Sequence, residues 1–333
     1  MVKYFICGES AQLVQAENFT PLCWVDMISP TDGEVETVSR QTGIAEDMIK
    51  AALDEEEMAR TEFDEGNSLF VVDCPIIEES DAGDSYSTLP LAIIYNKTCI
   101  ITVCLKGNPV LKDFISGRTK VRCDNSLDFI LKFLLGNAKR FLYCLKQIDR
   151  RSQRVQAELG SKLNNDDILQ LLELENSLVY FSTSLNSNAK VHEKLAKAEA
   201  VAKSDEYQDV YDDLVIECNQ AIEMCKIYKD TLSVSMDAYG SVISNNANDS
   251  MKKLTIITIL LAIPTMIAGF WGMNMPVPFQ AFHGETSTIW WWLVIAITLV
   301  ITAVIAVFML KTKALERTAK RKTKRQKKNR KKK

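Results

Sequence analysis

The chain has 333 residues, of which 47% are hydrophobic and 25% charged, enough to build a soluble domain larger than any membrane part. Its two histidines and nine cysteines, with no C-x-x-C pair, leave almost no ligand set for a structural zinc site, so reduced, buried thiols are expected. No glycine-rich phosphate loop, nucleophile elbow or zinc-hydrolase motif appears, and an enzyme is therefore not expected.

The net charge of −3 conceals two regions of opposite charge. Residues 311–333 carry fourteen Lys or Arg and one Glu, which leaves 26 basic and 42 acidic residues in the rest of the chain. No apolar stretch with a small-residue cleavage site follows Met1, so export of the large domain is not expected.

Residues 1–120 predict a domain of mixed α and β structure. Thr31 followed by Glu34 is a capping box, and Asn108 before Pro109 predicts a second helix start. Short runs rich in β-branched and apolar residues predict five strands, the last two joined as a hairpin through Asn96 and Lys97. These runs are Lys3–Cys7, Leu22–Asp26, Ser68–Cys74, Leu89–Tyr95 and Cys99–Cys104.

Residues 121–250 predict long helices, because proline is absent from Asn125 to Pro264 and apolar residues recur at steps of three and four. A first helix contains Leu127 to Ile148, and Asn165 predicts the N-cap of a second. A third begins near Ser204 and is expected to continue into the membrane as one stalk of about sixty-five residues, far longer than a normal globular helix.

Two uncharged apolar runs follow, Leu254–Gly272 with 19 residues and Ile289–Leu310 with 22. A helix needs about 20 residues to cross a ~30 Å hydrocarbon core, so the runs predict a membrane hairpin. Its parts are a pore helix over 251–274, an outer loop over 275–288, a second span over 289–310 and a basic tail over 311–333. Lysines flank the hairpin at its inner ends and the loop has none, which places both termini in the cytoplasm.

A stripe of small or polar residues runs along the third helix into the first span. Alternating steps of four and three keep the stripe on one face of a slightly supercoiled helix. A dry helix–helix seam and a water-accessible path both explain it, and its extension down to Asn248 and Asp237 favours the path. The stripe consists of Asp237, Ser241, Ser244, Asn248, Met251, Thr255, Thr258, Ala262, Thr265, Gly269 and Gly272.

One hairpin cannot enclose a pore, so several copies are expected around an axis, where each stripe residue becomes a ring. A ring of Asn274 amide oxygens at the outer mouth suits Mg2+, a small ion that keeps its water and needs neutral acceptors to hold it without stripping it. Asp237 would attract cations near the cytoplasmic opening, and Met251 would form a hydrophobic constriction that gates the path.

Gly272-Met273-Asn274 ends the first span just before a short loop, a last span and a basic tail. This arrangement, with Trp24-Val25-Asp26, Ser29-Pro30-Thr31 and the segments 251–257 and 267–274, resembles the CorA family of divalent-cation channels. The resemblance implies an α+β cytoplasmic domain with a long helical stalk and two transmembrane helices, assembled as a homopentameric funnel in the plasma membrane. It also implies transport of Mg2+, with Co2+ or Ni2+ as secondary substrates, and Gly272, Met273 and Asn274 as the selectivity signature.

The resemblance further implies that intracellular Mg2+ closes the channel by bridging acidic residues of neighbouring subunits. Asp209 and Asp212 match one half of that sensor, whereas Lys50 and Ala51 occupy the positions of its acidic partner. The run Asp54–Glu57 is a candidate substitute, although a solvated acidic surface explains it too. Trp271 stands where the family usually has Tyr.

Two other functions remain open at this point. A Zn2+ transporter of the same fold is favoured by His283 in the outer loop, because imidazole suits zinc. A membrane-anchored oligomeric scaffold would use the stripe as a seam. The basic tail is expected to meet anionic lipid of the inner leaflet, with no nucleic-acid partner.

Overall fold

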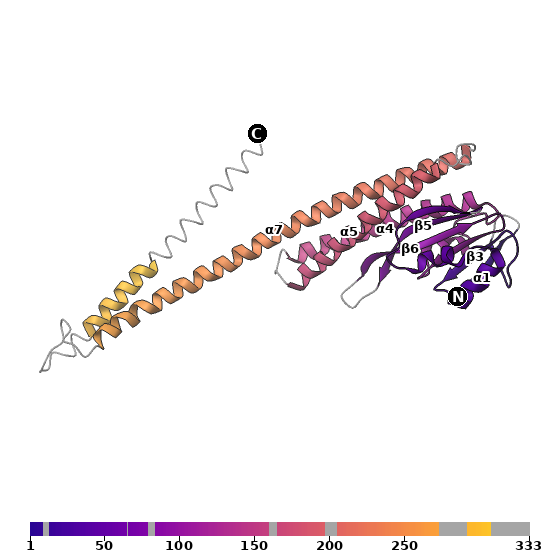
Figure 1. Ribbon diagram of the computed structural model, residues 1–333. Helices are drawn as coiled ribbons and strands as arrows, with labels where there is room; N and C mark the ends of the chain where they lie inside the picture. Colours follow the sequence, from indigo (N-terminus) through magenta and orange to yellow (C-terminus); the bar gives the residue numbers. More distant parts are fainter. Residues whose placement is uncertain are drawn as a thin grey trace, which may run out of the picture. The chain divides into compact units, whose positions relative to one another are not determined.

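The computed structural model describes residues 1–8, 13–64, 66–78, 84–159, 165–196, 205–272 and 292–307. The chain forms two compact units, Met1–Ala238 and Tyr239–Lys333. The first unit holds a mixed sheet with helices on both of its faces, and the second holds apolar helical segments (Figure 1).

The sheet of the first unit has seven strands in the order β2-β1-β3-β7-β6-β5-β4. Its central pair, β3 and β7, is parallel, with Cys23 opposite Cys99 and Ile28 opposite Cys104. All other neighbours are antiparallel. The strands are β1 (Val2–Cys7), β2 (Leu13–Ala16), β3 (Cys23–Ile28), β4 (Arg60–Asp64), β5 (Asn67–Glu78), β6 (Ser85–Tyr95) and β7 (Cys99–Cys104).

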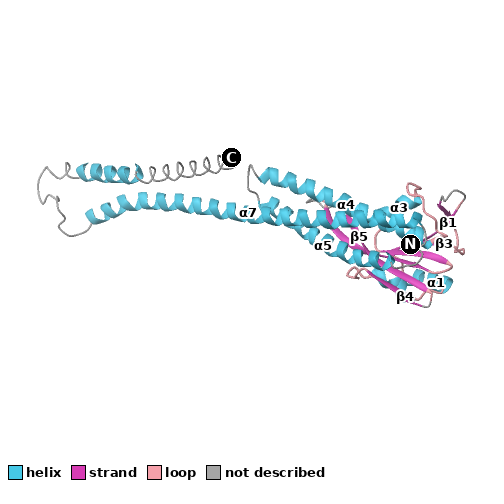
Figure 2. Ribbon diagram, turned by 90° about the horizontal axis from the view of Figure 1, so that it is seen from above, coloured by secondary structure: helices cyan, strands magenta, loops and turns pink. Residues whose placement is uncertain are grey.

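Each face of the sheet has its own hydrophobic core, because successive side chains of a strand point to opposite faces. Val25 packs in a core with the helices α1 (Asp32–Thr42), α2 (Glu46–Lys50) and η1 (Ala51–Leu53). Its neighbour Trp24 packs on the other face, where Phe129 of α4 lies 5.2 Å from it between ring centroids. This second face is covered by α3 (Pro109–Ile115), α4 (Ser126–Leu159) and α5 (Asn165–Ala196), as Figure 2 shows.

The local start signals predicted from the sequence are confirmed. Thr31 Oγ1 accepts from the Glu34 backbone N–H at 3.4 Å, while a Glu34 carboxylate oxygen accepts from the Thr31 N–H at 2.9 Å. The Asn108 side chain accepts from the Val110 N–H at 2.8 Å, with Pro109 in the first turn of α3. β6 and β7 pair as the predicted hairpin, and the Asn96 side chain accepts from the Cys99 N–H in its turn.

Two strands were not predicted. β2 is short and β4 is largely exposed, and each lies at an edge of the sheet. The boundary expected after residue 120 also does not separate compact units, because α4 and α5 pack on β5 and share a core with the sheet.

The third long helix, α7, runs from Asp205 to Trp271 and has 67 residues, as the unbroken stalk pattern predicts, and it continues through Pro264. Within the first unit its buried residues recur at steps of four and three, a spacing typical of a coiled-coil seam. Tyr211 donates from its hydroxyl to the His192 carbonyl of α5 at 3.3 Å, and Cys225 lies 3.3 Å from the Leu178 carbonyl. The buried residues of this seam are Leu214, Cys218, Ala221, Cys225 and Leu232.

Candidate functional site

One helix in the described part of the chain, α7, is long and apolar enough to cross a membrane, and none of its most apolar stretch is buried. A second apolar helix, Trp292–Val307, is shorter within the described residues. The part of α7 after Ala238 and the helix Trp292–Val307 both belong to the second compact unit.

Every residue of the predicted stripe is exposed in the single chain. The exposure includes Met251, which has 63% of its side-chain surface accessible. The hydroxyl, amide and small side chains of the stripe, which Met251 interrupts, are therefore exposed in the part of the chain that the structure describes.

The face of α7 that does pack is a different one. Ile256, Ile259, Ile263 and Ile267 are half-buried. At ~100° per residue, these positions lie roughly opposite the stripe. Pro264 and Ile267 line a hollow of about 480 Å³ together with residues of the helix Trp292–Val307, so the two helices lie side by side there. The second helix thus packs on part of the apolar side of α7, while Leu254, Ile257 and Leu261 stay exposed. Of the stripe, Gly272 at the outer end also lines the hollow.

Threonines of the stripe hydrogen-bond to their own helix. The hydroxyls of Thr255, Thr258 and Thr265 donate to carbonyl oxygens four residues earlier, at 2.9, 2.9 and 2.8 Å. Each hydroxyl proton is therefore satisfied inside the helix, which lowers the cost of a polar side chain in hydrocarbon. The hydroxyl oxygens still have lone pairs, and the stripe consequently presents hydrogen-bond acceptors.

The predicted selectivity signature is only partly within the described residues. Gly272 ends α7, where its N–H donates to the Ala268 carbonyl at 2.9 Å. Met273 and Asn274 lie outside the described residues, as do His283 in the loop 275–288 and the tail 311–333.

The two acidic residues assigned to the sensor, Asp209 and Asp212, are exposed near the start of α7. The Gln208 amide donates to a carboxylate oxygen of Asp212 at 2.9 Å. Lys50, which stands at one expected acidic position, pairs with Asp32 at 3.2 Å and with Glu46 at 3.4 Å. Within the described residues, no three His, Cys, Asp or Glu side chains lie together in a way that could hold a metal ion.

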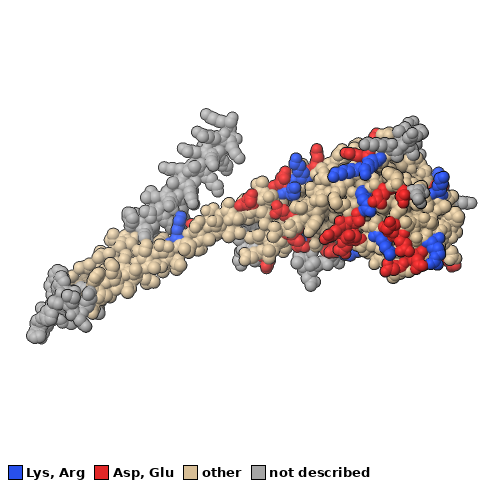
Figure 3. Space-filling view, viewed as in Figure 1, with Lys and Arg blue, Asp and Glu red and all other residues tan. Residues whose placement is uncertain are grey.

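The acidic run Asp54–Glu57, which follows η1, is mostly exposed, and its last member, Glu57, forms an ion pair with Arg60. Acidic and basic side chains alternate over the first unit on the face seen in Figure 3. The apolar stretch of α7 is almost uncharged on the same face. The charge pattern separates a polar surface, where divalent ions can be attracted, from the apolar helices.

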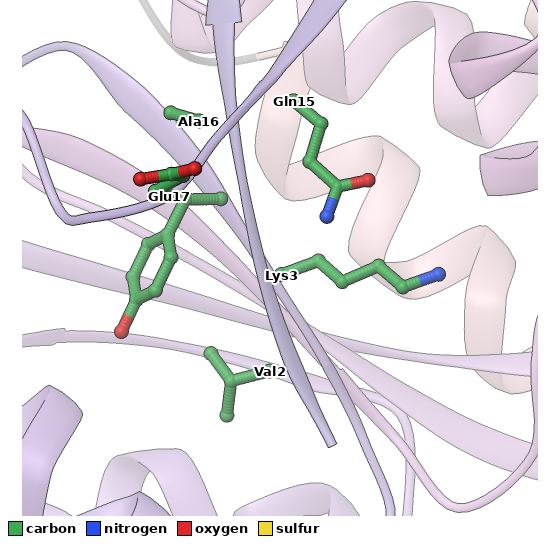
Figure 4. Close-up of a pocket in the computed structure, with 6 residues that line it drawn as sticks. Val2, Lys3, Gln15, Ala16 and Glu17 are labelled. Carbon is green, nitrogen blue, oxygen red and sulfur yellow. The ribbon is translucent and has the colours of Figure 1, made fainter.

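A hollow of about 370 Å³ at the edge strand β2 and its neighbour β1 does not form a comparable site. Figure 4 shows Lys3 and Gln15 extending to one side of the strand, and Val2 and Glu17 to the other. Because the polar groups diverge, they do not converge on a common ligand.

Sequence reasoning missed the packed face of the first span and the back-bonding of its threonines. The packed face was readable in principle, since Ile256, Ile259, Ile263 and Ile267 recur at steps of three and four. The back-bonding also has a local signal, because a threonine in a helix interior can donate to the carbonyl four residues earlier.

Comparison with known proteins finds relatives that match most of the chain. A family model described as "CorA-like Mg2+ transporter protein" matches residues 20–321. The "Cobalt/magnesium transport protein CorA" of Methanocaldococcus jannaschii is 27% identical over 285 residues, which cover 84% of this chain and 87% of the relative. The protein with the same name from Thermotoga maritima is 24% identical over 316 residues, covering 89% and 84%.

Among solved structures, the complete structure of the CorA magnesium transporter from Methanocaldococcus jannaschii superposes with a TM-score of 0.76 at 23% identity. The match covers 92% of this chain and 96% of that structure. At this identity the likeness shows the fold, which is an α/β domain followed by a long helix.

Proposed function

The chain belongs to the family of CorA-like Mg2+ transporters and is a divalent-cation transporter, and from this premise we propose that it is a homopentameric channel for hydrated Mg2+. The observation that carries the proposal is the exposed stripe of α7, which from Asp237 to Gly269 lies away from the face packed on the second apolar helix. A polar face without cover inside one chain requires either water or other subunits in a membrane. Copies arranged around an axis provide both.

The chemistry of the stripe suits an ion that keeps its water. A hydrated cation presents water hydrogens outward, so the wall of its path needs acceptors. Thr255, Thr258 and Thr265 supply hydroxyl oxygens whose protons are already donated to carbonyls of the helix. Mg2+ dehydrates reluctantly and is therefore the divalent ion best matched by outer-sphere acceptors.

We propose that Asn274 holds the hydrated ion at the outer mouth, with Gly272 and Met273 shaping the chain around it. Met251 is the hydrophobic constriction, and Asp237 attracts cations at the inner end. Transport of Co2+ or Ni2+ through the same rings is a secondary activity.

The topology that we propose places both termini in the cytoplasm and the loop 275–288 outside. It rests on the lysines at the inner ends of the two apolar runs and on their absence from the loop. The basic tail 311–333 then lies beside the inner leaflet, where each basic residue near anionic lipid contributes ~1 kcal/mol.

Ion flux into proteoliposomes tests the proposal. Asn274→Ala should abolish Mg2+ uptake and leave the oligomer intact, because it removes the amide acceptor. Asn274→Asp should change the ranking of Mg2+, Co2+ and Zn2+, since a carboxylate ring binds cations more strongly. Asn219→Ala, which alters an exposed asparagine of α7 outside the stripe, is the matched control. Near-normal Mg2+ uptake by Asn274→Ala would contradict the selectivity assignment.

The same assay separates the competing functions. Zn2+ uptake that depends on a pH gradient, with little Mg2+ uptake, would favour a zinc transporter. A lack of flux for every ion, with an intact oligomer, would favour a scaffold.

A further inference from the structure

Two thiols meet where the sheet joins the first long helix. Cys7 is the last residue of β1, and Cys123 lies three residues before the start of α4. The backbone N–H of Cys123 donates to the Cys7 sulfur, with 3.1 Å between nitrogen and sulfur. Cys7 is half-buried, whereas Cys123 is only 2% exposed. Cys7 is the one cysteine of the chain that is not fully buried.

The Cys123 sulfur lies near that of Cys7. It is three covalent bonds from the nitrogen that contacts the Cys7 sulfur, so rotation about one side-chain bond changes the distance between the two sulfurs. Burial raises the pKa of the Cys123 thiol, and a hydrogen bond with the Cys7 thiol raises this pKa further.

The surroundings of the two thiols differ. The Arg122 guanidinium donates to an Asp124 carboxylate oxygen at 2.8 Å. Asp124 raises the pKa of Arg122 most, and the Cys7 thiol makes a smaller contribution in the same direction. The Cys7 sulfur accepts the Cys123 N–H, and the Cys7 thiol donates to the Val121 carbonyl at 3.9 Å. Cys123 is buried and is affected by the Asp124 carboxylate, which disfavours its thiolate. Cys7 is thus the thiol that a peroxide can reach, and Cys123 is the buried partner that can resolve its oxidised form.

We propose that Cys7 and Cys123 are a redox-modification site, which forms a reversible disulfide when a hydroperoxide oxidises Cys7. The Cys7 thiolate attacks the peroxide oxygen, the O–O bond breaks, and the leaving oxygen takes a proton as water or an alcohol. The resulting sulfenic acid is attacked at sulfur by Cys123, whose proton goes to the departing hydroxide to form water. Two thiols lose two electrons, and the peroxide gains them.

The position of the pair makes the modification structurally consequential. Asn125, two residues after Cys123, accepts from the N–H groups of Leu127 and Asp128 and so caps α4. It also donates from its side chain to the Tyr207 hydroxyl of α7 at 2.6 Å. A Cys7–Cys123 bond would therefore tie β1 covalently to the connection that holds the first turns of α4 and α7.

Other cysteines that are close together lack the access that this pair has. Cys23 and Cys99 are register partners on the parallel strands β3 and β7, yet they are 0% and 3% exposed. They serve as an internal control, because they share proximity without an accessible thiol.

The test uses the full-length protein in detergent, treated briefly with hydrogen peroxide, then alkylated and digested for mass spectrometry. A Cys7–Cys123 cross-linked peptide should form and disappear with dithiothreitol, and it should form at least roughly tenfold faster than any Cys23–Cys99 peptide. Cys123→Ser should instead accumulate Cys7 sulfenic acid that dimedone traps, and Cys7→Ser should leave Cys123 reduced.

Size-exclusion chromatography of each variant shows whether the assembly is preserved, and wild-type protein alone supplies the cross-link measurement if a variant does not fold. The proposal is overturned if peroxide leaves Cys7 and Cys123 unlinked in the native protein. It is equally overturned if Cys23–Cys99 forms at the same rate, or if Cys123 oxidises unchanged in Cys7→Ser.

Discussion

A buried carboxylate in the central strand shows how single residues set the stability of the first unit. Asp26 is 2% exposed and accepts from the Thr102 hydroxyl at 2.9 Å, and Thr102 in turn accepts from the Trp24 indole N–H at 2.9 Å. Burial raises the pKa of Asp26, and the Thr102 hydrogen bond opposes that shift only in part. Because the folded pKa is raised, the folded state binds this proton more tightly than the unfolded state does.

The sign of the resulting pH dependence follows from linkage. Stability from this group is present below the unfolded pKa and is lost as pH rises through the folded pKa. We therefore expect wild-type protein to lose more unfolding free energy between pH 4 and pH 7 than Asp26→Asn does. Trp24 fluorescence reports unfolding of the first unit, because the other four tryptophans all lie at or after residue 271, in the second unit. A difference between the two proteins that stays constant over this range would contradict the assignment.

At the scale of elements, local signals were predictable and long-range pairing was not. Thr31, Asn108 and the Asn96 turn act within a few residues of themselves, so the sequence around them is sufficient. β4 has the sequence RTEFD, and charged side chains of this kind are typical of an edge strand. These charges interrupt the apolar pattern from which a strand is predicted. The parallel pairing of β3 with β7 joins residues more than seventy positions apart and has no local signature.

The stripe of α7 was predictable for a related reason, because a helical period is local. What remained open was whether the stripe faces a dry seam or water. The packing of the second helix on α7 shows which face of α7 is covered within the described residues, and so favours the water-accessible path. The sequence of α7 alone does not contain this information, because the second helix is a separate segment of the chain.

The contact between α3 and α4 gives a prediction at this scale. A Cβ on Gly136 of α4 would lie 2.7 Å from a methyl carbon of Val110, which is 7% exposed. Overpacking of this kind costs about 1–3 kcal/mol, so Gly136→Ala should lower the unfolding free energy by that amount. Adding Val110→Ala should return part of it.

Gly240→Ala is the matched control, because a Cβ there meets nothing within 4 Å. Alanine in an exposed helix interior is more favourable than glycine by about 0.5–1 kcal/mol, so this variant should be as stable as the parent or more stable. Thermal unfolding of both variants measures the difference. Equal effects of the two substitutions would contradict the packing account.

At the scale of the whole molecule, we propose feedback by internal Mg2+, which depends on more than one chain. Asp209 and Asp212 are exposed, and no group of three possible ligands lies together in the ranges that the structure describes. We propose that a neighbouring subunit completes the site. Lys50 stands at one acidic position of the family pattern and forms ion pairs with Asp32 and Glu46. One acidic partner is therefore missing, and weaker inhibition by Mg2+ is expected.

Asp209→Ala combined with Asp212→Ala should raise the internal Mg2+ needed for half-maximal closure several-fold, because bridging stabilises the closed state only through its higher ion affinity. Current recorded at controlled internal Mg2+ measures this. Glu223→Ala, an exposed carboxylate of the same helix, should leave closure unchanged. A double variant that closes at the parental Mg2+ concentration would show that this sensor does not operate here.

The central claim is that the stripe of α7 faces water in the assembled protein, and cysteine labelling from the cytoplasmic side tests it most directly. The native background is low, since eight of the nine cysteines are buried and Cys7 can be replaced by serine. Cysteines at Ser244, Asn248 and Thr258 should react with a small aqueous thiol reagent at low internal Mg2+. Cysteines at Ile257, Leu261 and the half-buried Ile263 should not. Equal protection of both sets would contradict the account and leave the stripe as a dry seam.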